Sequence, residues 1–149
     1  MKINLTVYTP DSKPAIEEKY NVVQFLYHHL EQYRDSEEDI QKSVDYALAN
    51  DKFTGGIVIV AKLQNEIVGA VIINCTGMNG YVPDNLLVYI AVHNKHRGKK
   101  IGRFLMNKTI DLTDGDIALH VEADNPAKLL YEKVGFTNKY LEMRYIKPI

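Results

Sequence analysis

The chain has only one cysteine, Cys75, among its 149 residues. A single thiol excludes an internal disulfide and every zinc site built from several cysteines. No apolar run approaches the roughly 20 residues that a membrane-spanning helix needs, so we expect no membrane segment. The first ten residues also lack the apolar core of roughly 7–15 residues that marks a signal peptide, and we therefore expect a cytoplasmic protein.

An excess of charge of one sign is also missing. Eighteen Lys and Arg residues against 19 Asp and Glu residues give a net charge of −1, which argues against a domain-wide basic field for nucleic acid. The hydrophobic fraction of 46% is that of a globular protein and excludes a disordered chain. Because this length fits one compact domain better than two, we expect residues 1–149 to form a single domain.

The hydrophobic pattern switches between alternating and helical spacing along the chain. We expect strands at residues 3–8, 57–63, 67–73, 86–92 and 117–122, and a strand-like end at 136–146. Apolar residues at helical spacing predict helices near residues 15–33, 36–50, 101–112 and 126–134. Because helices alternate with strands in the second half, part of the sheet should be parallel, in an α/β or α+β fold.

The turn at residues 97–102 carries the sharpest chemical signal. Five Lys or Arg residues lie between Lys95 and Arg103, directly before an amphipathic helix. First-turn N–H groups and the helix dipole favour an anion there, and glycines let the backbone approach it closely. This pattern fits a polyphosphate site or, equally, a solvated basic turn. Neither G-x-x-x-x-G-K-[ST] nor G-x-G-x-x-G occurs, which disfavours a P-loop and a dinucleotide fingerprint.

Two stretches resemble known motifs of one family. V-Y-I-A-V-H-N-K-H-R-G-K-K-I-G-R-F-L-M resembles the signature of the GCN5-related N-acetyltransferases, whose turn reads Q/R-x-x-G-x-G/A. Arg97 fits its first position and Gly102 its last, whereas Lys100 replaces the first glycine. A-D-N-P-A-K-L-L-Y-E-K-V-G-F is similar to the family's second signature. The resemblance implies a mixed, mostly antiparallel sheet of six or seven strands flanked by about four helices.

The resemblance also implies acetyl-CoA as cosubstrate and no metal. The pyrophosphate would bind the amides of the turn, and the pantetheine arm would pair with a strand that splays from its neighbour. The coenzyme residues implied in this way are Ile90, Ala91, Val92, Arg97, Gly98, Lys99, Lys100, Ile101, Gly102, Arg103 and Asn125. A lysine can adopt ordinary helical angles, so the turn should still bind if the φ angle of Lys100 is negative.

The reaction implied by the resemblance is direct attack of a primary amine on the thioester. Tyr131 matches the family's general-acid tyrosine, although its apolar face would also suit a core residue. His120 has a pKa suited to a general base, and a water chain is the alternative. Asn125 either contacts the coenzyme or caps a helix, and in the first case Asp124 competes with it for the family's asparagine position.

Other features leave alternatives open. Many members of the family carry a glutamate in this strand, where this sequence has Val88 and Tyr89. A non-catalytic acyl-CoA sensor of the same fold is therefore the alternative function. His28 and His29 are adjacent on a helix and cannot form an i, i+4 metal pair. The acidic residues between positions 31 and 39 could attract an amine or simply be solvated. We expect an acetyl-CoA and amine-binding protein without nucleic-acid or membrane partners, and a homodimer is possible.

Overall fold

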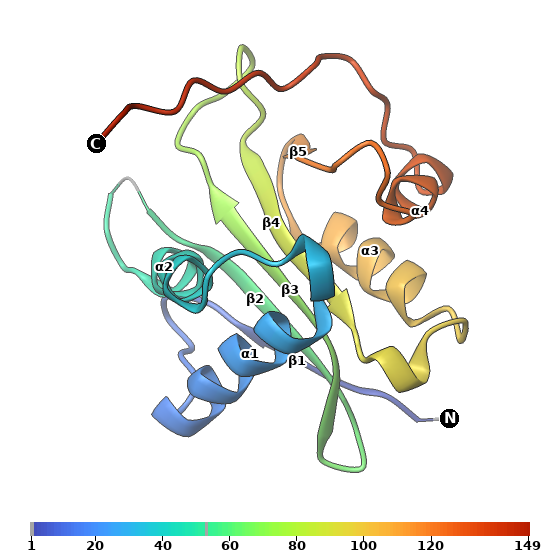
Figure 1. Cartoon of the computed structure of the whole chain (residues 1–149). Helices are drawn as coiled ribbons and strands as arrows, with labels where there is room; N and C mark the ends of the chain where they lie inside the picture. The colour runs from blue at the N-terminus through green and yellow to red at the C-terminus, as the bar shows by residue number, and fades with distance from the viewer. Residues whose placement is uncertain (1, 53) are drawn as a thin grey trace.

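The computed structural model describes residues 2–52 and 54–149 and contains one mixed sheet. The strand order follows the chain order, with antiparallel neighbours from β1 to β4 and a parallel β4–β5 pair. The strands are β1 (Asn4–Tyr8), β2 (Gly56–Leu63), β3 (Glu66–Cys75), β4 (Asn85–Val92) and β5 (Ile117–Leu119). The mixed, mostly antiparallel sheet expected from the resemblance is therefore confirmed (Figure 1).

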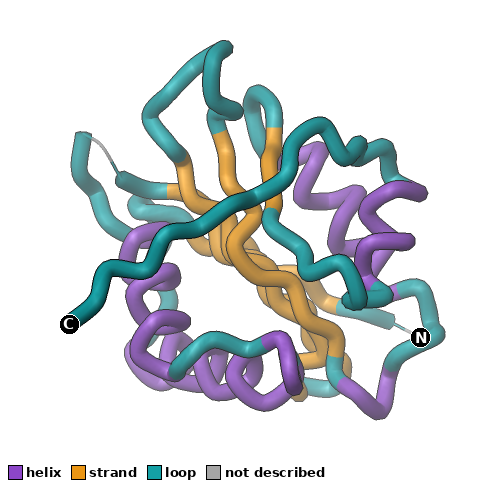
Figure 2. The backbone as a smooth tube through the Cα atoms, turned by 45° about the horizontal axis from the view of Figure 1, so that its top comes forward, coloured by secondary structure: helices purple, strands orange, loops and turns teal. Residues whose placement is uncertain are grey.

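Helices cover both faces of this sheet, so the fold has three layers (Figures 1 and 2). One face packs against α1 (Ile16–His29) and α2 (Glu37–Leu48), and its core includes Val23, Ile40 and Tyr89. The other face packs against α3 (Ile101–Leu112) and α4 (Ala127–Lys133), and its core includes Leu105 and Tyr131. Two short 3₁₀ helices, η1 (Glu31–Tyr33) and η2 (Asn94–His96), lie in the connections.

Local sequence signals explain several element boundaries. Ser36 Oγ accepts a hydrogen bond from the Asp39 N–H at 3.1 Å, which is the cap expected at the start of α2. The first helix ends at His29, earlier than expected, because Glu31 has a left-handed backbone with φ of 55°. Gln64 and Asn65 both have positive φ, as a two-residue hairpin turn requires, and they join β2 to β3.

The C-terminal expectation is wrong. Residues 136–149 have the alternating sequence of a strand but no strand pairing, and the sheet has five strands instead of six or seven. Tyr140, Leu141 and Met143 are 78–90% exposed, and this stretch extends from α4 toward the opposite side of the molecule (Figures 1 and 2). Alternation supplies only propensity, and a strand also needs an edge to pair with, of which the three-residue β5 offers little.

No helix within the described ranges is long and apolar enough to cross a bilayer.

Candidate active site

A β-bulge at Val88 reorganises the middle of β4. Ile72 of β3 pairs with Tyr89 and Ile73 pairs with Leu87, so Val88 is an extra residue in the ladder. Leu87 therefore packs on the α3 face, whereas Val88 and Tyr89 both pack on the face of α1 and α2. The bulge turns the Tyr89 side chain toward the connection between those two helices.

Beyond the bulge, β4 and β5 part. The parallel pairing covers only Asn85–Leu87 against Ile117–Leu119, while β4 continues to Val92. Residues 88–92 thus have no strand partner on the β5 side within the described chain. This divergence is the geometry that the resemblance implies for a strand that pairs with a pantetheine arm. It leaves residues 90–92 paired with β3 on one side only, and on the other side the Val92 carbonyl accepts from Arg97 Nε at 3.3 Å.

The turn that follows leads directly into the start of α3. The first intrahelical bond that reaches back to the turn is Phe104 N–H to Lys100 O at 3.1 Å. The amides of Ile101, Gly102 and Arg103 therefore have no carbonyl partner within the helix and point out of its N-terminus. Together with the helix dipole they form a cradle that suits a pyrophosphate.

Two residues of this turn have a left-handed backbone. Gly98 has φ of 80°, and no atom lies within 4 Å of the position that a Cβ would take. Lys100 has φ of 65°, so the condition of a negative angle set from the sequence is not met. Lys100 therefore has the left-handed backbone conformation that a glycine would adopt more easily. For a residue other than glycine, this conformation is less favourable by about 1–2 kcal/mol. The turn keeps its shape at the expense of local strain.

Position 102 requires a glycine because of close packing and not because of its backbone conformation. A Cβ at this position would lie 3.2 Å from Leu130 Cδ2 and 3.7 Å from Val92 Cγ2. The glycine thus allows the start of α3 to approach the end of β4 and the α4 helix closely. This close approach brings Ile90, Val92, Ile101 and Tyr131 into one apolar cluster.

The Arg97 side chain turns back toward α1. Its Nη2 donates to the His29 carbonyl at 2.7 Å, its Nε donates to the Val92 carbonyl at 3.3 Å, and its Nη1 pairs with Glu31. The guanidinium lowers the pKa of Glu31 through that hydrogen bond and its charge. Arg97 therefore holds the turn against the C-terminus of α1, where a cation suits the helix dipole. The contact of Arg97 with the coenzyme remains a prediction, and the exposed Lys99, Lys100 and Arg103 are the other cations of the turn.

Tyr131 lies in the core beside the gap. Only 8% of its surface is exposed, and its ring contacts that of Phe136 at 6.1 Å between centroids. Burial raises its pKa to about 12, so the hydroxyl stays protonated at neutral pH. The structure therefore places Tyr131 in the core, and its role as general acid remains a prediction.

The other two predicted residues follow β5. His120 is exposed one residue beyond the end of the strand, and no hydrogen bond or ion pair holds its ring in the described part of the chain. Asn125 Oδ1 accepts from the Ala127 N–H at 2.9 Å and so caps the start of α4. The structure thus places the Asn125 side chain in the capping role, and a role of His120 as base remains a prediction.

Two tyrosines connect the α1–α2 elbow to the site, and the sequence did not reveal them. Tyr89 O–H donates to Asp35 Oδ2 at 2.5 Å, and burial together with this carboxylate raises the pKa of Tyr89. Tyr33 O–H donates to the Asp124 carbonyl at 3.2 Å, which links η1 to the segment after β5. The elbow therefore spans the gap between β4 and β5 and places the exposed Asp35 beside the bulge. Partners 54 and 91 residues apart leave no local sequence signal.

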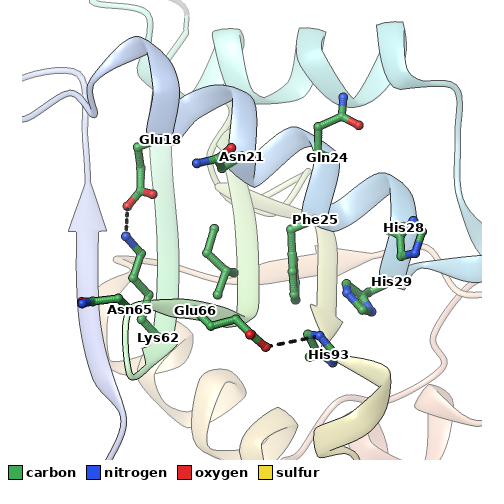
Figure 3. A pocket seen from close by; sticks show the side chains of 11 residues that line it. Glu18, Asn21, Gln24, Phe25, His28, His29, Lys62, Asn65, Glu66 and His93 are labelled. Carbon is green, nitrogen blue, oxygen red and sulfur yellow. Dashed lines mark ion pairs between the residues drawn. The ribbon is translucent and has the colours of Figure 1, made fainter.

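A separate open pocket of about 440 Å³ lies between α1 and the β2–β3 hairpin (Figure 3). Phe25 stands in its middle, the Glu18–Lys62 ion pair closes one end, and the Glu66–His93 ion pair lies at the other. None of the predicted coenzyme residues within the described chain lines this pocket. It is therefore distinct from the gap between β4 and β5.

Comparison with known proteins agrees with this geometry. The domain described as "Acetyltransferase (GNAT) domain" matches residues 54–138, more than half of the chain. The matched part runs from the start of β2 to just beyond α4, and so includes the bulge, the gap and the turn. The chain belongs to the GNAT acetyltransferase family, which implies acetyl transfer from acetyl-CoA.

Solved structures share the fold over their full length. A possible acetyltransferase from Clostridium difficile 630 is 19% identical with a TM-score of 0.68, covering 100% of this chain and 99% of the other. A transcriptional regulator from Bacillus halodurans C-125 is 18% identical with a TM-score of 0.68, covering 97% and 100%. An aminoglycoside 6'-N-acetyltransferase from Acinetobacter haemolyticus is 16% identical with a TM-score of 0.65, covering 100% and 99%. At these identities the likeness establishes the fold alone.

Proposed function

We propose that residues 1–149 form one N-acetyltransferase domain that moves the acetyl group of acetyl-CoA to a primary amine of a small molecule or peptide. The observation that carries this proposal is the gap between β4 and β5 together with three features of the segments that pack around these strands. These are the free amides at the start of α3, the protonated hydroxyl of Tyr131, and the carboxylate of Asp35.

On the coenzyme side, the turn amides and the strand end act on different parts of the ligand. The amides of Ile101, Gly102 and Arg103 accept the pyrophosphate, with Lys99 and Lys100 adding positive field. On the side where β5 has diverged, the backbone of residues 90–92 pairs with the amides of the pantetheine arm, in the manner of an added strand. This arrangement directs the thioester toward the bulge.

On the acceptor side, Asp35 supplies negative charge at the mouth of the gap. Its carboxylate is exposed and already holds the Tyr89 hydroxyl, which fixes its position. A cationic amine that approaches from the elbow gains a charge-assisted hydrogen bond there. This arrangement favours acceptors that are protonated in water, such as polyamines, aminoglycosides and lysine-like amines.

The chemistry needs one acid and one base. The amine nitrogen forms a bond to the thioester carbon, the C–S bond breaks, and the coenzyme leaves as a thiolate. Tyr131 O–H gives its proton to that sulfur, and the amine loses its proton to His120 or to a water chain that leads to solvent. A buried hydroxyl whose pKa is about 12 transfers its proton only as negative charge develops on sulfur.

Two measurements test this function. The first is calorimetric titration of the chain with acetyl-CoA, together with Gly102→Glu and Gly102→Ala. Both variants meet Leu130 at the same 3.2 Å contact, but only the glutamate adds charge to the cradle. We expect the wild type to bind acetyl-CoA. Gly102→Ala should lose only the affinity that follows from the closer contact with Leu130, whereas Gly102→Glu should lose binding altogether.

The second measurement is thiol release over a panel of amines. Release with one amine class supports the transferase and names its acceptor, whereas tight binding without release on any amine favours the sensor of the same fold. No binding of acetyl-CoA by the wild type would overturn both functions. A solved structure of similar fold, described as a transcriptional regulator, makes the sensor outcome worth measuring.

A further inference from the structure

Four of the five histidines of the chain gather at one corner of the molecule. His28 and His29 come from the end of α1, and His93 and His96 flank η2 after β4. The rings of His29 and His93 lie 4.2 Å apart between centroids, and those of His93 and His96 lie 5.3 Å apart. Part of this corner, with His28, His29 and His93, forms one end of the pocket in Figure 3, and η2 connects it to the turn before α3.

Within this corner, three residues bring ligand atoms together. One atom each of Glu66, His93 and His96 lie within 4.8 Å of one another, and Glu66 Oε1 is 3.5 Å from His93 Nε2. Ligand atoms around a tetrahedral zinc ion are roughly 3.3 Å apart, because each bond is roughly 2.0–2.1 Å long. The exposed Glu66 side chain and the His96 side chain need only small rotations to reach this spacing.

We propose that Glu66, His93 and His96 form a binding site for a divalent transition metal ion of the zinc class. Two imidazoles beside one carboxylate suit Zn²⁺, Ni²⁺ and Cu²⁺, whereas Mg²⁺ and Ca²⁺ prefer ligand sets made of oxygen atoms alone. Three protein ligands leave a fourth position open to water.

The backbone holds these ligands in place before any ion arrives. Glu66 is the first residue of β3, directly after the tight hairpin turn, and His93 N–H bonds to Val68 O at 2.9 Å. His96 N–H bonds to the His93 carbonyl at 2.9 Å, which closes the turn of η2. Preorganised ligands lose little conformational entropy on binding.

His29 packs against the proposed site and is not one of its ligands. Its Nδ1 accepts from the Asn94 N–H at 3.2 Å, and its ring stacks on His93. Burial, reinforced by the neighbouring cations, lowers its pKa to about 4, so it adds no positive charge against an incoming metal ion. Lys99 acts in the opposite direction, since its Nζ lies 3.4 Å from His96 Nδ1.

Metal binding also changes the hydrogen bonding of η2. His93 Nδ1 accepts from the Lys95 N–H at 3.1 Å, which leaves the proton of the neutral ring on Nε2, next to Glu66. Coordination through Nε2 moves that proton to Nδ1, so the Lys95 amide loses its acceptor. The Lys95 amide therefore reports on the site directly.

The test uses the complete chain without an affinity tag and measures binding of ZnCl₂ by calorimetry and of Co²⁺ by visible absorption. We expect one saturable ion per chain and weaker binding of about tenfold or more in Glu66→Gln, His93→Gln and His96→Gln. His28→Gln and His120→Gln are matched controls and should bind as the wild type does. Lys99→Gln should bind more tightly, because it removes the competing cation.

An amide spectrum recorded during zinc titration should shift Lys95 in the wild type, and in Glu66→Gln the same shift should need about tenfold more zinc or more. Thermal unfolding shows whether each variant is folded. If His93→Gln does not fold, the Glu66→Gln and His96→Gln variants still test the proposal. The proposal is overturned by absence of saturable Zn²⁺ binding, by unchanged affinity in the Glu66 and His96 variants, or by equal loss in the controls. Acetyl-CoA is absent throughout, so the result is independent of the transferase assignment.

Discussion

The Tyr89 hydroxyl donates a hydrogen bond to the Asp35 carboxylate at 2.5 Å, joining β4 to the elbow between α1 and α2. Tyr89 is buried and Asp35 is exposed, so the pair fixes a negative charge at the surface from a rigid base in the sheet. For the amine acceptor that we propose, this charge is the feature of the elbow with the clearest chemical use. The predictions below begin with it.

Asp35→Asn should weaken the binding of the acceptor and leave the binding of acetyl-CoA unchanged. The amide oxygen still accepts from Tyr89, but the charge is gone, and a charge-assisted hydrogen bond is worth about 1.5–3 kcal/mol. We expect the KM for a cationic acceptor to rise about tenfold or more, with an unchanged Kd for acetyl-CoA. Glu38→Gln is the control, since Glu38 is an exposed acid in the first turn of α2. An equal effect of both variants would indicate a general field instead of a specific contact.

Tyr131→Phe should lower turnover by about a hundredfold or more, because general-acid catalysis contributes at least that much. The Kd for acetyl-CoA should not change, since the ring still fills its place in the core. Because the pKa of Tyr131 is raised to about 12, its ionisation should not reduce kcat between pH 7 and pH 9. Steady-state kinetics of this variant and of Tyr140→Phe, an exposed tyrosine, decide the assignment. Equal kcat values for Tyr131→Phe and the wild type would remove the acid role.

Lys100→Gly should make the chain more stable. The residue is left-handed at φ of 65°, and relief of about 1–2 kcal/mol of strain exceeds the glycine's entropic cost of about 0.5–1 kcal/mol. We expect the unfolding free energy in urea to rise by up to about 1 kcal/mol. The neighbouring Lys99, whose backbone is not left-handed, gives the control Lys99→Gly, which should destabilise. Destabilisation by both would show that the turn is unstrained.

His29 should make stability depend on pH. Its pKa is about 4 in the folded chain and about 6.5 in the unfolded one, so only the unfolded chain takes up a proton in between. Stability therefore falls as the pH drops below about 6.5, by about 1–2 kcal/mol at pH 5. The charged groups that face His29 are His93, His28, Arg97 and Glu31.

The measurement is urea unfolding of the wild type, His29→Gln and His28→Gln at pH 7 and pH 5. The amide of His29→Gln offers an acceptor for the Asn94 N–H and does not titrate, so the loss between the two pH values should shrink. His28→Gln, an exposed neighbour, should keep the wild-type loss. An identical loss of stability in all three proteins would show that groups other than His29 cause the pH dependence.

Sequence patterns were sufficient wherever a structure is held by local interactions. The cap at Ser36, the hairpin turn at Gln64 and Asn65, and the basic turn before α3 all lie where their residues predict. The apolar run of β4 predicted a buried strand, but it could not reveal the bulge, because every residue around Val88 is apolar.

Features that depend on distant partners were beyond the sequence. The segment at 136–146 alternates as a strand does, yet pairing requires an edge that β5 does not supply over three residues. Asp35 and Tyr89 are 54 residues apart, and Glu66 meets His93 only because β3 and β4 are neighbours. Lys100 in a left-handed turn is a conformation that its residue type disfavours, so tertiary context decided it.

The extra residue at Val88 also decides which changes of length the chain tolerates. Removal of Val88 would restore regular alternation and leave Leu87 on the α3 face and Tyr89 on the α1–α2 face, so Tyr89 would keep its hydrogen bond to Asp35. Removal of Ile90, beyond the bulge, would instead exchange the faces of Ala91 and Val92. Insertions in the exposed loop 77–81 change none of these positions. The bulge thus gives β4 one residue whose loss would shorten the strand without reversing its faces.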